Sequence, residues 1–236
     1  MALSVLITGV LLLAIDGTVL YLAVPSLSRE LEPTAEQLLW IGDIYSLALA
    51  GLLVIMGTAS DRVGRKRLLL IGVAAFGLSS LLAAFAATPE TLIAARALLG
   101  VSGAAIMPST LALIRNIFTD PKERTRAIAI WSAAFGGGSA IGPLVGGLLL
   151  EHFWWGSVFL VNVPVMLVML VAGIVLLPES KNPTPGRFDV WSAVLSLATV
   201  TPLVYAIKHT VASGFDPVTA ACLIGGLAAG YLFVRR

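Results

Sequence analysis

The chain has 236 residues, of which 58% are hydrophobic and only 12% charged, with a formal net charge of +2. Soluble domains carry about 25% charged residues, so this composition excludes a soluble fold and places the chain in a lipid bilayer. No basic tract indicates a nucleic-acid partner. No nucleophile–base pair, metal-ligand cluster or nucleotide-binding loop is visible, so we expect neither an enzyme nor a cofactor.

Eight apolar segments follow one another along the chain, each of 18 residues or more and therefore long enough to cross a bilayer. They are continuous rather than alternating, which indicates helices, because only helices or closed barrels satisfy their own backbone in lipid. The sequence thus predicts an all-α integral membrane protein. The eight predicted spans are 4–25, 38–59, 68–88, 92–114, 127–150, 154–177, 190–208 and 217–234.

Lys and Arg set the orientation of these spans, since they concentrate on the cytoplasmic side of membrane proteins. A cytoplasmic N-terminus leaves only Arg29 and Lys208 in outer loops. Both termini are then predicted to be cytoplasmic. The bases on the inner side are Arg62, Arg65, Lys66, Arg67, Arg115, Lys122, Arg124, Arg126, Lys181, Arg187, Arg235 and Arg236.

Asp16 lies just past the middle of the first span. A charge at the centre of a membrane helix costs about 2.5–3.5 kcal/mol on insertion scales, which favours a functional role. A proton and a cationic ligand would compete for this one carboxylate, and such competition is the physical basis of antiport. The alternative is a hydrogen-bonded Asp16 that only ties helices together.

Asp43 and Arg96 lie nearer the outer ends of the second and fourth spans. Asp43 is either a coupling residue or a solvated acid of an outer vestibule. Arg96 shares one helix face with Gly100 and Gly103, where another backbone can approach closely. The arginine then needs an acidic partner, either Asp16 or Asp43, unless this face serves helix packing alone.

The turn between the second and third spans combines one acid, four bases and two glycines. Orientation alone explains the bases. It does not explain Asp61, which opposes the orientation signal, so we predict a specific contact for this acid. The residues of interest in this hairpin are Gly57, Asp61, Arg62, Gly64, Arg65 and Lys66.

The fifth span repeats glycine every four residues, a pattern typical of close helix packing. Its proline breaks a backbone hydrogen bond and can bend the helix. The alternative is a plain packing or dimerising helix. The residues concerned are Gly138, Gly142, Pro143, Gly146 and Gly147. Two helix starts also carry capping signals, at Thr34 and at Asp120.

A proline-rich stretch, 178–188, divides the chain into a six-span domain, 1–177, and a two-span domain, 189–236. The count of six is consistent with two groups of three spans in inverted topology, a plan that many transporters share.

Together these residues resemble the major facilitator superfamily. The hairpin with Gly57, Asp61 and Gly64 resembles the family's loop 2–3 motif, and Arg96 with Gly100 and Gly103 resembles its span-4 motif. Gly138–Gly147 is similar to the span-5 motif of antiporters. The surroundings of Asp16 resemble the fourteen-helix drug:proton antiporter branch, and Leu38–Ser46 is similar to its quaternary-ammonium and dye efflux pumps.

The resemblance implies proton-coupled efflux of lipophilic cations by alternating access in the plasma membrane, driven by the proton gradient without a cofactor. It implies that Asp16 binds the cation or proton and that Arg96 helps to move the proton. Asp61 would contact a second, C-terminal six-helix bundle, which this chain does not contain. The alternatives are export of an endogenous metabolite or lipid, and a non-transporting fragment or subunit.

Overall fold

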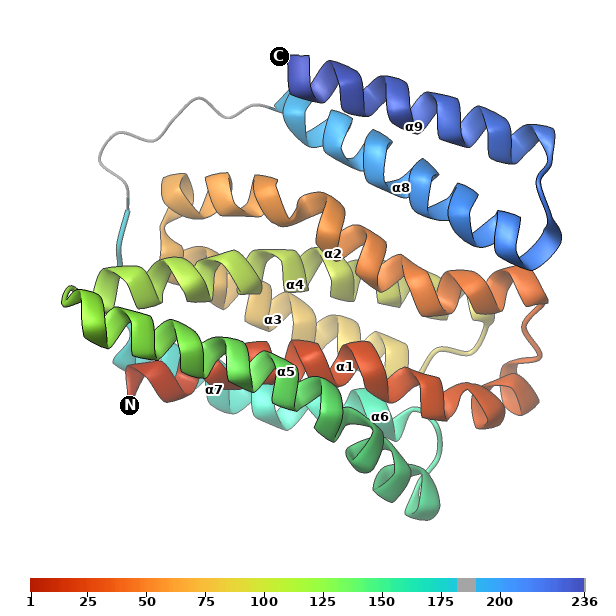
Figure 1. The fold of residues 1–236 in the computed structure, drawn as a ribbon. Coiled ribbons are helices and arrows are strands. Elements are labelled where there is room, and N and C mark those ends of the chain that lie inside the picture. The colour runs from red at the N-terminus through yellow and green to blue at the C-terminus, as the bar shows by residue number, and fades with distance from the viewer. Residues whose placement is uncertain (182–189, 236) are drawn as a thin grey trace.

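The computed structural model describes residues 1–181 and 190–235, and within these ranges all regular secondary structure is helical (Figure 1). Most of the proline-rich stretch, including Arg187, lies outside the described residues, as does Arg236. The helices are α1 (Ala2–Leu31), α2 (Ala35–Val63), α3 (Arg65–Ala84), α4 (Pro89–Ile117), α5 (Pro121–His152), α6 (Ser157–Leu160), α7 (Asn162–Leu176), α8 (Val190–Ser213) and α9 (Pro217–Arg235).

Both predicted capping signals are confirmed. The Thr34 hydroxyl accepts the Gln37 backbone N–H at 3.2 Å, and the Gln37 side-chain oxygen accepts the Thr34 N–H at 2.8 Å. Asp120 accepts the backbone N–H groups that open α5. These bonds satisfy donors that the first helical turn leaves unpaired, so both helices begin several residues before their apolar segments.

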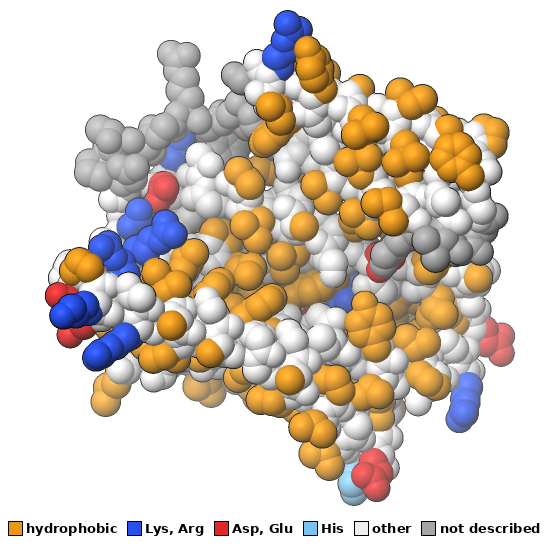
Figure 2. Space-filling view, in the orientation of Figure 1, with side chains coloured by type: hydrophobic (Ala, Val, Ile, Leu, Met, Phe, Trp, Pro, Cys, Tyr) orange, Lys and Arg blue, Asp and Glu red, His pale blue; other side chains and the backbone are white. Residues whose placement is uncertain are grey.

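Among the described residues, seven helical segments are long and apolar enough to cross a membrane, with α6 and α7 together forming the sixth. In α8 the apolar part among the described residues is the shorter stretch Val194–Ile207, so its crossing stays a prediction. Many large apolar side chains on the outer surface are exposed (Figure 2). Such a surface suits lipid rather than water, and the chain is a multi-pass membrane protein.

The sixth segment differs from the predicted continuous helix over 154–177. The helix begins only at Ser157 and is interrupted at Val161, between α6 and α7. Pro164 accounts for the interruption, because it has no N–H to offer the carbonyl of Leu160 and its ring crowds that carbonyl. The break places Asn162 at the first position of α7.

The bundle is built from closely packed helix pairs, α1 with α5 and α2 with α4, while α3 packs on α4 and on α7. The α8–α9 hairpin lies on the α2 side of the molecule (Figure 1). Both ends of the described chain lie at the same end of the bundle, where several Lys and Arg side chains also gather (Figure 2).

The glycine stripe of α5 packs against α1. A Cβ on Gly138 would lie 2.8 Å from both the Leu11 carbonyl oxygen and the Ala14 Cβ, and one on Gly142 would collide with Thr18. Gly146 is similarly close to Val19. The predicted packing role of these three glycines is confirmed, whereas Gly147 has open space around it and Pro143 is exposed.

We predict that Gly138→Ala destabilises the protein by about 1–3 kcal/mol, because the added methyl group overpacks the α1–α5 contact. Gly137→Ala is the matched control, since a Cβ there meets nothing within 4 Å, and alanine favours the helix by up to about 1 kcal/mol. Thermal unfolding of the purified protein in detergent, followed by tryptophan fluorescence, measures both. Equal losses of melting temperature would contradict the packing assignment.

Candidate functional site

The centre of the bundle holds a buried ion pair between α1 and α4. The Asp16 Oδ2 atom lies 2.9 Å from Nη1 of Arg96, and the two side chains are 0% and 1% exposed. A buried charge is tolerated only when it is paired and hydrogen-bonded. The structure therefore confirms that Arg96 needs an acidic partner and selects Asp16 from the two candidates.

Arg96 is held on two further sides by α2. Its Nε donates to the Ile41 carbonyl at 3.2 Å, and its guanidinium carbon lies 4.6 Å from the centroid of the Tyr45 ring. The Tyr45 hydroxyl in turn donates to the Leu13 carbonyl of α1 at 3.1 Å. A guanidinium over an aromatic face gains electrostatic attraction, so the cation keeps partners in addition to Asp16.

Asn162 binds the other oxygen of the Asp16 carboxylate. Its Nδ2 donates to Oδ1 of Asp16 at 2.8 Å and to the Ser80 hydroxyl oxygen at 3.3 Å. Asn162 is fully buried, and its own Oδ1 has no hydrogen-bond partner among the described residues. Sequence reasoning missed this residue, although an amide inside an apolar span is a recognisable signal of a polar contact between helices.

Gly100 explains how Arg96 reaches α2. A Cβ at Gly100 would collide with the Tyr45 carbonyl and would lie 2.8 Å from the Ala48 Cβ. The backbones of α4 and α2 are therefore in direct contact one helical turn from Arg96, as the spacing of the glycines predicts. Gly103 lies on the same face of α4. A Cβ added there would lie 3.1 Å from side-chain atoms of Leu13 and of Leu49.

Asp43 lies on α2 with intermediate exposure, and the acid that pairs with Arg96 among the described residues is Asp16. The structure thus separates the two membrane acids, one enclosed with an arginine and the other partly accessible.

A single residue, Gly64, connects α2 and α3 in the hairpin. Gly64 has φ +116°, a backbone conformation that favours glycine because it has no Cβ. Asp61 accepts from Arg65 at Nε, 3.0 Å, and at Nη2, 2.8 Å. The predicted specific contact of Asp61 thus has a partner inside the hairpin itself, and contact with a second bundle stays a prediction.

The bases of the hairpin also bind the end of α7 and the residues after it, which orientation alone does not predict. The backbone N–H of Arg65 donates to the Ser180 carbonyl at 2.9 Å, and Nζ of Lys66 donates to the Ile174 carbonyl at 2.7 Å. Glu179 accepts from the Lys66 backbone at 3.2 Å. Arg62 is exposed, and Gly57 lies in ordinary contact distance of Pro108.

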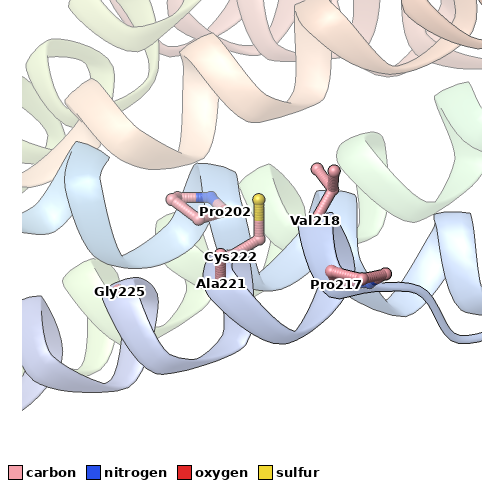
Figure 3. A pocket seen from close by; sticks show the side chains of 6 residues that line it. All are labelled: Pro202, Pro217, Val218, Ala221, Cys222 and Gly225. Atoms are coloured by element: carbon pink, nitrogen blue, oxygen red, sulfur yellow. The ribbon is translucent and has the colours of Figure 1, made fainter.

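A surface hollow of about 500 Å³ lies between α8 and α9 (Figure 3). All of its lining residues are uncharged and nearly all are apolar, so it offers no electrostatic attraction to a cation. They are Pro202, Pro217, Val218, Ala221, Cys222 and Gly225. The ion pair of α1 and α4, and not this hollow, is the candidate site.

Comparison with known proteins agrees with this arrangement. The family description "Major Facilitator Superfamily" matches residues 6–235. The chain is 57% identical over 235 residues to the multidrug efflux pump LfrA of Mycolicibacterium smegmatis, covering 100% of this chain and 47% of that protein. It is 44% identical over 224 residues to the methyl viologen resistance protein SmvA of Salmonella typhimurium, covering 94% and 45%.

A solved structure, that of the peptide transporter POT in complex with sulfate, shares the fold with a TM-score of 0.69 at 18% identity. The likeness covers 99% of this chain, α8 and α9 included, and 51% of the transporter. The chain spans about half the length of the curated relatives it matches.

We predict that Arg96→Leu lowers stability by about 3–5 kcal/mol, because it leaves the buried carboxylate of Asp16 without its cation. The double variant Asp16→Asn/Arg96→Leu should recover part of this loss, since no unpaired charge remains. Thermal unfolding of the single and double variants in detergent gives the coupling between the two residues. Strictly additive effects would show that the ion pair contributes nothing.

Proposed function

Because this chain belongs to the Major Facilitator Superfamily, we propose that it supplies the N-terminal part of a proton-coupled efflux pump for lipophilic cations, dyes and quaternary ammonium compounds. The family consists of transporters, not enzymes. The observation that carries the proposal is the enclosed Asp16–Arg96 pair. The names of two relatives, a multidrug efflux pump and a methyl viologen resistance protein, support it, since methyl viologen is itself a cation.

Three cations would compete for the Asp16 carboxylate: a proton, the transported cation and the tethered guanidinium of Arg96. In the described state the guanidinium occupies the carboxylate at 2.9 Å. Protonation removes the charge that attracts it, and Arg96 then keeps the Ile41 carbonyl and the Tyr45 ring. A proton and the substrate would thus exclude each other at the Asp16 carboxylate. Because only one of them can be bound at a time, the entry of one would be coupled to the exit of the other.

Access to Asp16 would require a change of conformation, because the carboxylate is 0% exposed. In alternating access one helical bundle rocks against another around a fixed site. A second six-helix bundle is the partner that this motion needs. The α2–α3 hairpin would gate it from the inner face, through Asp61, while the tight α1–α5 contact along Gly138 and Gly142 would move as one body.

The proposed topology has eight spans with cytoplasmic termini in the plasma membrane. Residues 1–177 would form the transport bundle, 178–188 a cytoplasmic linker and 189–236 an inserted helix pair. A 3+3 inverted repeat would relate α1 to α4 and α2 to α5. The pairing of α1 with α5 and of α4 with α2 supports this, because the two pairs exchange under that relation.

A second candidate is export of an endogenous metabolite or lipid, with drug efflux incidental. The apolar hollow of α8 and α9 favours it, because apolar lining accommodates a neutral chain better than a cation. A non-transporting fragment or subunit is the third reading.

Asp43 would act as a second coupling acid in the proposed cation pump, and its intermediate exposure makes it the more accessible of the two acids.

We predict that Asp16→Asn abolishes the pH dependence of cationic dye efflux in inverted vesicles that carry the full-length protein. The amide keeps the size of the side chain but neither binds a proton at physiological pH nor attracts a cation. Asp43→Asn is the comparison variant, with a partial loss expected. Unchanged dye transport and unchanged pH dependence in Asp16→Asn would eliminate the cation-site proposal.

We also predict a ranking of substrates by charge. Lipophilic cations should be transported at least about tenfold better than neutral analogues of similar size, since one desolvated charge pair is worth more than 1.4 kcal/mol. Anionic analogues should not be transported. Competition assays with a dye and charge-varied analogues measure the ranking, and preferential transport of a neutral lipid would favour the second candidate.

A further inference from the structure

The amide of Asn162 uses its donor and leaves its acceptor unused. Nδ2 donates to Asp16 Oδ1 at 2.8 Å and to the Ser80 hydroxyl oxygen at 3.3 Å. Oδ1 of the same amide is buried and finds no partner within the part of the chain that the structure describes. Buried polar atoms are almost always hydrogen-bonded, so an orphan of this kind calls for an explanation.

The two carboxylate oxygens of Asp16 differ in their surroundings. Oδ2 faces the guanidinium of Arg96 at 2.9 Å, whereas Oδ1 faces the neutral amide of Asn162. A proton bound to Asp16 therefore belongs on Oδ1, away from the cation. The protonated carboxyl then presents an O–H donor to the N–H donor of Asn162, and two donors facing each other repel.

We propose that Asn162 is the positioning residue that fits the site to both protonation states of Asp16, by a half-turn of its amide about the Cβ–Cγ bond. This inference rests on the proposed role of Asp16 in proton binding. The half-turn exchanges Nδ2 and Oδ1 within nearly the same outline. Oδ1 then accepts the O–H of Asp16 and the hydroxyl hydrogen of Ser80, while Nδ2 takes the orphan position.

No atom is transferred in this step: the proton stays on Asp16, and only the direction of two hydrogen bonds reverses. Each orientation leaves one amide atom without a partner, so neither protonation state is favoured on that account. An apolar residue at 162 would form no hydrogen bond with Asp16 in either protonation state. A residue that can only donate would form one with the carboxylate but not with the O–H of the protonated acid.

Few other titratable groups face Asp16. Arg96 comes from α4 and Tyr45 from α2. Asp43 is two residues from Tyr45 on α2, with intermediate exposure. The charged residues of α3 lie in its first turn, those of α5 lie at its two ends, and α6 and α7 have none. The pH response at this depth therefore reports chiefly on Asp16, and the comparison variant Asp43→Asn measures what Asp43 adds to it.

Loss of the amide should destabilise the carboxylate more than the protonated acid, because hydrogen bonds to charged groups are about twice as strong as neutral ones. In Asn162→Leu, an apolar variant of similar size, the midpoint of the pH dependence of dye efflux should rise by about one pH unit, a tenfold change in proton concentration. Asn162→Gln keeps the amide and should retain a midpoint near that of the wild type.

Infrared difference spectroscopy on the full-length protein in membranes supplies a second readout. The C=O stretch of protonated Asp16, assigned by its loss in Asp16→Asn, should move to higher frequency in Asn162→Leu. In the wild type, acidification should lower the frequency of the Asn162 amide C=O stretch, because Oδ1 gains two hydrogen bonds. This wild-type measurement tests the inference even if Asn162→Leu fails to fold.

The inference is overturned if Asn162→Leu keeps the wild-type midpoint and the wild-type Asp16 band, or if acidification leaves the wild-type amide band unmoved. Either result, in a protein whose pH dependence Asp16→Asn abolishes, leaves the proposed function intact. If Asp16→Asn itself keeps the pH dependence, the proposed function fails instead.

Discussion

A charge in the interior of a membrane protein must be paired, and this constraint organises the bundle around Asp16 and Arg96. Each side chain would be too costly alone in an apolar environment. Together they need helices α1 and α4 close enough for the two side chains to meet, with 2.9 Å between Oδ2 of Asp16 and Nη1 of Arg96. The glycines of α4 let α2 pack directly on α4, and those of α5 let α1 pack directly on α5, so the helices that carry and surround the pair are closely packed.

The same constraint would link the site to transport in the proposed mechanism. A carboxylate that must always have a cation or a proton can exchange one for another, but it is never left unpaired. In the proposed mechanism Arg96 would pair with the carboxylate between the binding of proton and substrate, and its contacts with Ile41 and Tyr45 would remain when it withdraws. In this account proton and substrate are coupled because the buried carboxylate cannot release one positive partner without binding another.

The sequence predicts a helical membrane protein, the two caps and the need of Arg96 for an acid, because these depend on local composition and spacing. It does not distinguish Asp16 from Asp43 as the partner, since that choice depends on how α1 and α2 are rotated about their axes. Asn162 is visible in the sequence as an amide inside an apolar run, but its contact with Asp16 is not, since that contact depends on how α7 is rotated about its axis. The sequence prediction of a continuous helix over 154–177 missed the break before Asn162, which follows from Pro164.

The α2–α3 hairpin shows the limits of charge counting. The orientation of the spans is enough to explain why the hairpin contains bases. Arg65 and Lys66 nevertheless also bind the end of α7 and the residues after it. Such contacts join segments more than 100 residues apart in the chain, and no local pattern predicts them.

The most direct test of the central claim is to count the protons released when a lipophilic cationic dye binds the purified full-length protein in weakly buffered solution. If proton and cation compete for Asp16, the wild type releases protons on binding and Asp16→Asn releases none. Equal proton release from both proteins would contradict the account.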